Sequence, residues 1–154
     1  MKKLSFIPAL LLILCTSCDS RRVYEHNVEI GQAGWSADDI RRFEVEIVNP
    51  AIPYNIYINI RNTDDYKYSN LWVFMTIEGP DGRQVTDTLE CPLADPGGRW
   101  YGSGIGDIAD VRILVKKDIR FVRQGKYTFS LEQAMRSQEL KNILNVGLRI
   151  ERAQ

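Results

Sequence analysis

The chain has 154 residues, and its 20 lysine and arginine residues are balanced by 20 aspartate and glutamate residues, so that the formal net charge is zero. This length suits a single domain, and the neutral balance gives no electrostatic reason to expect nucleic acid as a partner. Hydrophobic residues make up 44% of the chain and charged residues 26%, values that exclude wholesale disorder.

The chain begins with the pattern of a secretory signal peptide. Lys2 and Lys3 form a positively charged start, and an apolar stretch of eleven residues follows at positions 4–14. Because a membrane-spanning helix needs about 20 apolar residues, this stretch is too short for a comfortable span. Residues 1–17 are therefore predicted to be a signal peptide, which does not belong to the fold.

Cys18 is the predicted lipidation site. The small residues Thr16 and Ser17 directly before it resemble a lipobox, where signal peptidase II cleaves in front of a cysteine that carries lipid. The departure from that pattern is Cys15, since leucine is usual there. An ordinary signal peptide with a free Cys18 is the alternative. We expect the mature chain to begin at Cys18, to be held at the membrane by its lipid, and to have a tether over residues 18–27.

From residue 43 onward, apolar and polar residues alternate in seven segments, which is the period of a strand with one buried face. The apolar positions are Phe43, Val45 and Ile47; Tyr54, Ile56, Ile58 and Ile60; Leu71, Val73, Met75 and Ile77; Val85, Leu89, Cys91 and Leu93; Val111, Ile113 and Val115; Tyr127, Phe129 and Leu131; and Val146, Leu148 and Ile150. They predict an all-β domain over residues 28–154, with two antiparallel sheets packed as a sandwich. A jelly-roll topology is preferred, and an immunoglobulin-like topology is the alternative.

Two short helices and one buried thiol complete the predicted fold. Ser36 could cap a helix over residues 36–42, and Ser137 could cap another over residues 137–144. Cys91 lies at an inward position of its strand, so we expect it to pack in the core as an inert thiol.

Candidates for catalysis or metal binding are few. His26 is the only histidine, and no cysteine or second histidine stands at ligand spacing from it. The stretch around Ser103 lacks the G-x-S-x-G frame of a nucleophile elbow. The carboxylates Asp64 and Asp65 are adjacent, and adjacent residues of a strand point apart, so they suit a turn better than a glycosidase pair. The sequence thus predicts no enzyme activity, no metal and no cofactor.

Two polar segments, residues 61–70 and 100–110, are the best candidates for a recognition surface. Both offer aromatic rings for stacking and side chains for directed hydrogen bonds, as carbohydrate or peptide recognition requires. We expect them to meet at one end of the sandwich. The alternative is that these groups only satisfy the backbone of their own loops. The candidate recognition residues are Arg61, Asn62, Tyr66, Tyr68, Asn70, Trp100 and Asp107.

Several segments carry a family resemblance. They are residues 18–20 (CDS), 22–25 (RVYE), 53–62 (PYNIYINIRN), 68–71 (YSNL), 87–96 (DTLECPLADP), 98–100 (GRW), 104–108 (GIGDI), 132–136 (EQAMR) and 146–151 (VGLRIE). In these segments the chain resembles the gliding-motility lipoprotein family GldH, and the likeness covers nearly all of the mature chain.

The resemblance implies a process and no chemistry. Proteins of this family are lipoproteins of gliding Gram-negative bacteria and of non-motile relatives, needed for surface motility and associated with type IX secretion. Only the lipidated cysteine carries over, to Cys18. Two functions therefore stay open. One is a non-catalytic structural or interaction component of the envelope motility and secretion machinery, anchored in the outer membrane by a lipid such as palmitate. The other is a surface lipoprotein that binds carbohydrate.

Overall fold

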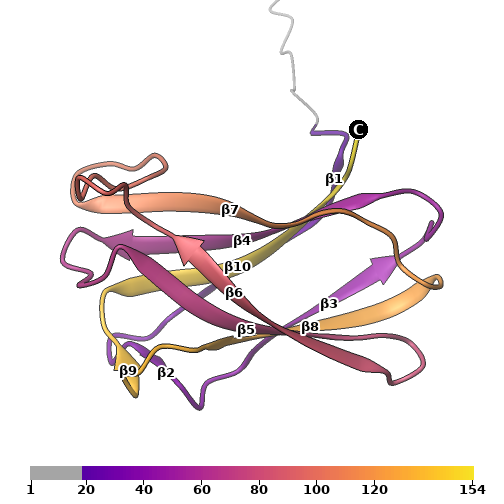
Figure 1. Ribbon diagram of the computed structural model, residues 1–154, viewed down its shortest axis with the longest axis horizontal. Coiled ribbons are helices and arrows are strands. Elements are labelled where there is room, and N and C mark those ends of the chain that lie inside the picture. The colour runs from indigo at the N-terminus through magenta and orange to yellow at the C-terminus, as the bar shows by residue number, and fades with distance from the viewer. Residues whose placement is uncertain (1–18) are drawn as a thin grey trace, which may run out of the picture.

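The computed structural model describes residues 19–154, which form an all-β sandwich and contain no helix (Figure 1). The signal peptide and Cys18 lie outside the described residues. Within residues 19–154, no helix is long and apolar enough to cross a membrane. The strands are β1 (Arg22–Glu29), β2 (Trp35–Ser36), β3 (Arg41–Ile47), β4 (Tyr54–Thr63), β5 (Asn70–Glu78), β6 (Gln84–Pro92), β7 (Ile108–Ile119), β8 (Gly125–Gln133), β9 (Glu139–Leu140) and β10 (Ile143–Arg152).

The long strands build two antiparallel sheets of four. The first sheet has the order β1-β10-β4-β7 and the second has the order β3-β8-β5-β6, while β2 and β9 pair separately. The hairpin β5–β6 lies at the centre of a nested series, in which β4 pairs with β7, β3 with β8, and β1 with β10. Successive pairs of this series alternate between the two sheets. This is a jelly roll of eight strands, so the preferred topology is confirmed and the immunoglobulin-like alternative does not apply.

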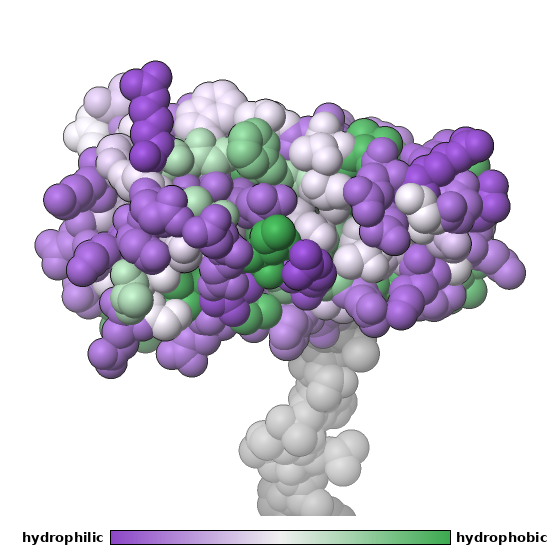
Figure 2. All heavy atoms as spheres, turned by 90° about the horizontal axis from the view of Figure 1, so that it is seen from below, coloured by the Kyte–Doolittle hydropathy of each residue, from purple (hydrophilic) through white to green (hydrophobic). Residues whose placement is uncertain are grey.

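The hydrophobic core lies between the two sheets. On β4, Tyr54, Ile56, Ile58 and Ile60 are at most 2% exposed, as the period of two predicted. Burying an aliphatic side chain of this size contributes about 1.5–3 kcal/mol. The outside is different: the face of the molecule in Figure 2 is mainly hydrophilic, and apolar residues reach it only in small separate patches.

Cys91 belongs to this core. Its side chain is fully buried on β6, and burial raises the pKa of the thiol to about 12. The core position predicted for this cysteine is therefore confirmed.

One residue of the predicted inward faces lies on the surface. Val85 is 62% exposed, although it stands in the same alternation as Cys91. It lies near the start of β6, an edge strand, and the β5–β6 hairpin projects from one end of the sandwich (Figure 1). The alternation of a strand shows which residues share a face, but the facing sheet decides how far that face is covered.

Neither predicted helix forms. Trp35 is fully buried and its indole nitrogen donates to the carbonyl of Asp39 at 2.8 Å, which ties residues 35–39 into a turn that leads directly into β3. Residues 137–144 contain bends, the short strand β9 and the start of β10. Asn142 has a φ of 69°, which a right-handed helix does not allow. Pairing of β2 with β9 outweighs the local capping signals of both segments.

The tether is shorter than residues 18–27. β1 begins at Arg22, so residues 22–27 are part of the first sheet and pair with β10. The N–H of Arg22 donates to the carbonyl of Asp19 at 3.2 Å, which forms a turn directly before the strand. The strand pattern of β1 is weak, since this segment carries charged residues on its outer face and only partly buried apolar residues on its inner face.

Candidate functional site

The two predicted recognition segments meet at one end of the sandwich. The N–H of Asp64 donates to the carbonyl of Asp107 at 2.8 Å, and the rings of Tyr66 and Trp100 lie 6.4 Å apart. Figure 1 shows both loops at the end where β4 finishes and β7 begins. The expectation that these segments share one end is therefore correct.

Two of the candidate recognition residues are interior. Asn62 is fully buried because it continues the inward face of β4 after Ile60, and its Nδ2 donates to the carbonyl of Thr63 at 2.9 Å. Tyr66 is 4% exposed, and its hydroxyl donates to the carbonyl of Asn70 at 3.2 Å. Burial raises the pKa of this phenol above its ordinary value. Asn62 and Tyr66 are therefore interior residues, and Tyr66 reaches the surface only at the edge of a small depression near β9.

The remaining candidates point to different sides of the molecule. Tyr68 is 40% exposed and its hydroxyl lies 3.2 Å from Ser137 Oγ, beside a depression of about 190 Å³ near β9. Asn70 donates to Glu90 at 2.7 Å across the second sheet. Trp100 is half-buried against the core, and Asp107 is exposed. Of the seven candidates, only Arg61 lines the most prominent polar cavity.

That cavity is a polar groove on the outer face of the first sheet. It has a volume of about 590 Å³ and is open to solvent. We call it the sheet groove. Four strands contribute to it, and the loop after Trp100 forms one wall. The polar residues that line it are Glu25, Asn27, Asn59, Arg61, Ser103, Asp110, Arg112 and Asn145.

Two glycines shape the sheet groove. A Cβ at Gly147, in the middle of β10, would lie 1.8 Å from Asn27 Oδ1, so only glycine lets the Asn27 side chain lie across this strand. From there Asn27 Oδ1 accepts a hydrogen bond from Asn59 Nδ2 at 3.0 Å. A Cβ at Gly102 would lie 1.9 Å from the carbonyl oxygen of Asp110, so the wall loop lies directly against β7.

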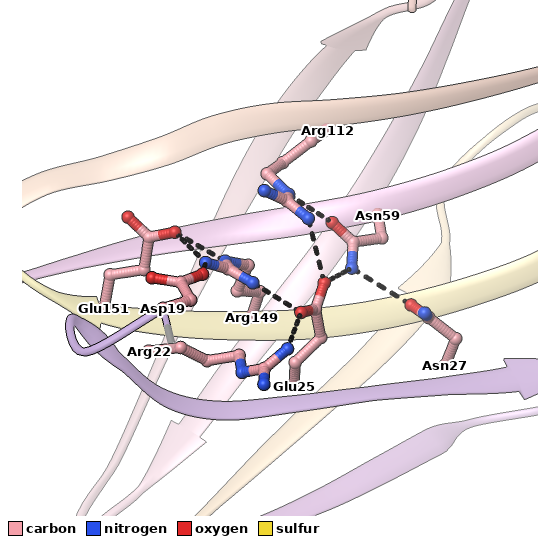
Figure 3. Close-up of polar contacts among 8 residues, drawn as sticks. All are labelled: Asp19, Arg22, Glu25, Asn27, Asn59, Arg112, Arg149 and Glu151. Atoms are coloured by element: carbon pink, nitrogen blue, oxygen red, sulfur yellow. Dashed lines mark hydrogen bonds and ion pairs between the residues drawn. The ribbon is translucent and has the colours of Figure 1, made fainter. Parts of the chain in front are cut away.

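An ionic network is centred on Glu25 and Arg149 (Figure 3), and its members Glu25, Asn59 and Arg112 also line the sheet groove. Glu25 Oε1 accepts from Asn59 at 3.0 Å and from Arg112 at 3.1 Å, and its other oxygen pairs with Arg149. The Arg149 side chain is 4% exposed and also pairs with Asp19 and Glu151. A buried guanidinium with three carboxylates around it is fully compensated in charge.

The pKa shifts in this network follow from its pairing. For Glu25, burial alone would raise the pKa, but hydrogen bonds from Arg149 and Asn59 outweigh burial and lower it. For Asp19, the hydrogen bond from Arg149 lowers the pKa. Burial also opposes the charge of Arg149, yet its hydrogen bonds with carboxylates raise its pKa. All three groups are therefore held in their charged forms.

The sheet groove offers ion pairs and directed hydrogen-bonding groups. Arg61 and Asp110 form a forked ion pair, with distances of 2.6 and 3.1 Å between nitrogen and oxygen. Amides and guanidinium groups present donors and acceptors in fixed directions. In the described part of the chain, no three His, Cys, Asp or Glu side chains are grouped as metal ligands.

The sequence prediction missed most residues of the sheet groove. Asn59 and Arg61 alternate with inward isoleucines on β4, so their outward orientation could be read from the sequence. Glu25 and Arg149 could not be brought together in this way, because they are 124 residues apart and meet through the pairing of the first and last strands. His26, between two groove residues of β1, points to the opposite face and lies edge-on to Phe43 at 6.2 Å.

Comparisons with known proteins agree over nearly the whole chain. A family model described as GldH lipoprotein matches residues 22–150, which include every polar residue that lines the sheet groove. The chain is 39% identical over 155 residues to the gliding motility lipoprotein GldH homolog of Christiangramia forsetii, with 96% of this chain and 94% of the relative covered. It is 35% identical over 156 residues to the gliding motility lipoprotein GldH of Flavobacterium johnsoniae, with 97% and 96% covered.

Proposed function

Because the chain belongs to the GldH lipoprotein family, we propose that it is a lipid-anchored component of the gliding-motility machinery that binds another envelope protein and catalyses no reaction. The observation that carries this proposal is the composition of the sheet groove. Its side chains form ion pairs and hydrogen bonds from four strands, as a surface that recognises a polar partner requires.

The absence of a catalytic role is part of the proposal. A nucleophilic serine needs a base within hydrogen-bond reach, and a general acid needs a carboxyl that keeps its proton near neutral pH. Ser103 lies in the sheet groove, but His26 faces away from it. Glu25, the most enclosed carboxylate of the groove, has a lowered pKa and therefore remains ionised.

Cys18 is the proposed site of the lipid, and the outer membrane is the proposed location. The residue after it, Asp19, pairs with the buried Arg149. A lipid on Cys18 would therefore hold the sandwich close to the membrane, with almost no spacer. Association with type IX secretion belongs to the same proposal, on the strength of the family resemblance.

A deletion strain of the source bacterium tests this function. The strain should lose colony spreading and secretion through the type IX system, and the wild-type gene should restore both. Cys18→Ala should restore neither and should fail to take up an alkynyl fatty acid. Full restoration by an unlabelled Cys18→Ala protein would contradict the anchored role.

Carbohydrate binding is the second candidate, and the amides of the sheet groove favour it. Asn27, Asn59 and Asn145 line the groove beside paired charges, so the surface offers many neutral donors and acceptors to a polyol. Specific binding of residues 19–154 to a glycan array, weakened by Asn145→Ala, would support this function. Co-purification of envelope proteins with no glycan binding would support the first.

A further inference from the structure

One end of the sandwich, which we call the anchor end, holds the residue that follows Cys18. Asp19 is fixed there by its ion pair with Arg149 at the start of the turn into β1. The ends of four adjacent strands lie next to Asp19. Arg22 at the start of β1 pairs with Glu151 of β10, and Tyr54 at the start of β4 pairs with Arg152 of β10 and Ile119 of β7. With strands about 4.8 Å apart, these four ends span about 14 Å. Figure 1 shows the start of β1 and the C-terminus side by side.

Hydrogen bonds join the segments of the anchor end into one rim. The N–H of Arg152 donates to the carbonyl of Arg21 at 2.9 Å, and the N–H of Ala153 donates to the carbonyl of Pro53 at 2.9 Å. The guanidinium of Arg120 donates to the carbonyl of Ala51. The segment before β1, the C-terminal residues and the loops before β4 and after β7 are therefore hydrogen-bonded to one another.

Apolar side chains project from this rim into solvent. Val48, directly after β3, is 76% exposed, and Val122, in the loop after β7, is 88% exposed. Phe121, the neighbour of Val122, packs inward against Tyr54 with ring centroids 5.4 Å apart, and this contact directs Val122 outward. A groove of about 340 Å³ continues this surface. Apolar side chains such as Ile77, Val85, Ile119 and Val122 line it together with six charged residues, Asp81, Arg83, Asp87, Lys116, Arg120 and Arg123.

Basic side chains gather at the anchor end. Its segments, residues 19–22, 46–54, 78–85, 116–126 and 151–154, carry nine basic and six acidic side chains, and two of the basic ones, Lys116 and Lys126, pair with Asp87 and Glu44 on other strands. Within the described residues, Arg21, Arg120 and Arg152 are exposed and have no carboxylate partner. Basic side chains around exposed apolar tips are typical of a surface that rests on anionic lipid headgroups.

We propose that the anchor end docks on an anionic lipid bilayer, with Val48 and Val122 at the headgroup level. The inference rests on the lipid anchor proposed at Cys18, which would bring this end of the sandwich to the bilayer surface. Arg21, Arg120 and Arg152 then face lipid phosphates, while the loop around Ile105, at the other end of the sandwich, faces away from the membrane.

Fluorescent labels on the full lipidated protein test this orientation. Val48→Cys and Val122→Cys are labelled with the dye NBD, with Ile105→Cys as the control because Ile105 is 91% exposed at the opposite end. Cys91 is buried, so it stays unlabelled in the folded protein. In vesicles of phosphatidylethanolamine and phosphatidylglycerol, labels at positions 48 and 122 should shift to shorter wavelength and be quenched by nitroxide headgroup lipids at least three times more strongly than the label at 105.

Three outcomes would overturn the docking. A label at position 105 quenched as strongly as those at 48 and 122 would show that the sandwich lies on another face. If all three labels report an aqueous environment while the protein floats with the vesicles, the docking would be overturned and the lipid anchor would stand. Protein that does not float with the vesicles would overturn both. Replacing phosphatidylglycerol with phosphatidylcholine should weaken the quenching at 48 and 122, and an unchanged signal would contradict the role of the arginines.

Discussion

Arg149 on the last strand pairs with Asp19, which stands 130 residues earlier and directly follows the predicted lipidated cysteine. The pair closes the jelly roll at the point where its two chain ends meet. Glu25 on β1 and Glu151 on β10 also form ion pairs with the Arg149 guanidinium (Figure 3). One buried side chain therefore joins β10 to the turn before β1 and to Glu25 of the sheet groove.

Arg149→Ala should lower the free energy of unfolding by about 3 kcal/mol, because it removes the ion-pair partner of Asp19 and Glu151 and leaves Glu25 with only its more exposed arginine partners. Chemical denaturation of residues 19–154 measures this. Arg112→Ala is the matched control, since its ion pair with Glu25 involves a side chain that is 49% exposed. The control should cost less than about 1 kcal/mol. Equal effects of the two substitutions would show that the Arg149 network does not stabilise the fold.

Gly147→Ala should destabilise the protein by about 1–3 kcal/mol, since the new Cβ would overlap Asn27 Oδ1 and would also lie 2.7 Å from the backbone carbonyl oxygen of His26. The double variant Gly147→Ala/Asn27→Ala should recover part of that loss, because the two sites are in contact and their effects are not additive. Gly31→Ala is the control, as no atom beyond its chain neighbours lies within 4 Å of the place that a Cβ would take there. Additive effects at positions 27 and 147 would contradict the contact.

Because of Glu25, the free energy of unfolding should decrease at acidic pH. Its pKa is lowered in the folded protein, so its contribution is complete above the ordinary glutamate pKa of about 4.3 and is lost as pH falls through the lowered value. Between about pH 5 and pH 3, the free energy of unfolding should fall less steeply in Glu25→Gln than in the wild type. Glu44→Gln, which alters an exposed pair with Lys126, serves as control. Parallel curves for Glu25→Gln and the wild type would refute this.

Two neighbouring tyrosines should behave differently on truncation. Tyr66→Ala should cost about 3 kcal/mol because the ring is buried, whereas Tyr68→Ala should cost less than about 1 kcal/mol. Thermal or chemical unfolding distinguishes them. A small loss for Tyr66→Ala would return this ring to the candidates for recognition.

The sequence predicted which residues of a strand point into the core and which point outward. It did not predict which strands lie side by side. Alternation on β4 places Ile56 inside and Asn59 outside, and its continuation also places Asn62 inside, although the polar side chain suggested a loop. Which strands then lie beside β4 depends on non-local pairing. The meeting of Glu25 with Asn59 and Arg149 is a consequence of that pairing and left no local signal.

Local signals also predicted two helices that the tertiary structure overrides. Ser36 does accept a hydrogen bond from the N–H of Asp38, at 3.3 Å, as a capping residue would. Because Trp35 is buried and β2 pairs with β9, this segment forms a short strand followed by a turn, and Ser36 caps only that turn. A capping residue predicts a helix only where the following residues can bury an apolar stripe.

Photo-crosslinking from the sheet groove tests the central claim most directly. A photoreactive amino acid replaces Arg61 in the groove or Lys126 on the outer face of the second sheet; both residues form exposed ion pairs, so neither replacement should unfold the protein. In living cells, position 61 should crosslink to a defined envelope protein, position 126 should not, and Asn145→Ala should reduce the product. Crosslinking from position 126 alone, or equal products from both positions, would contradict recognition through the sheet groove.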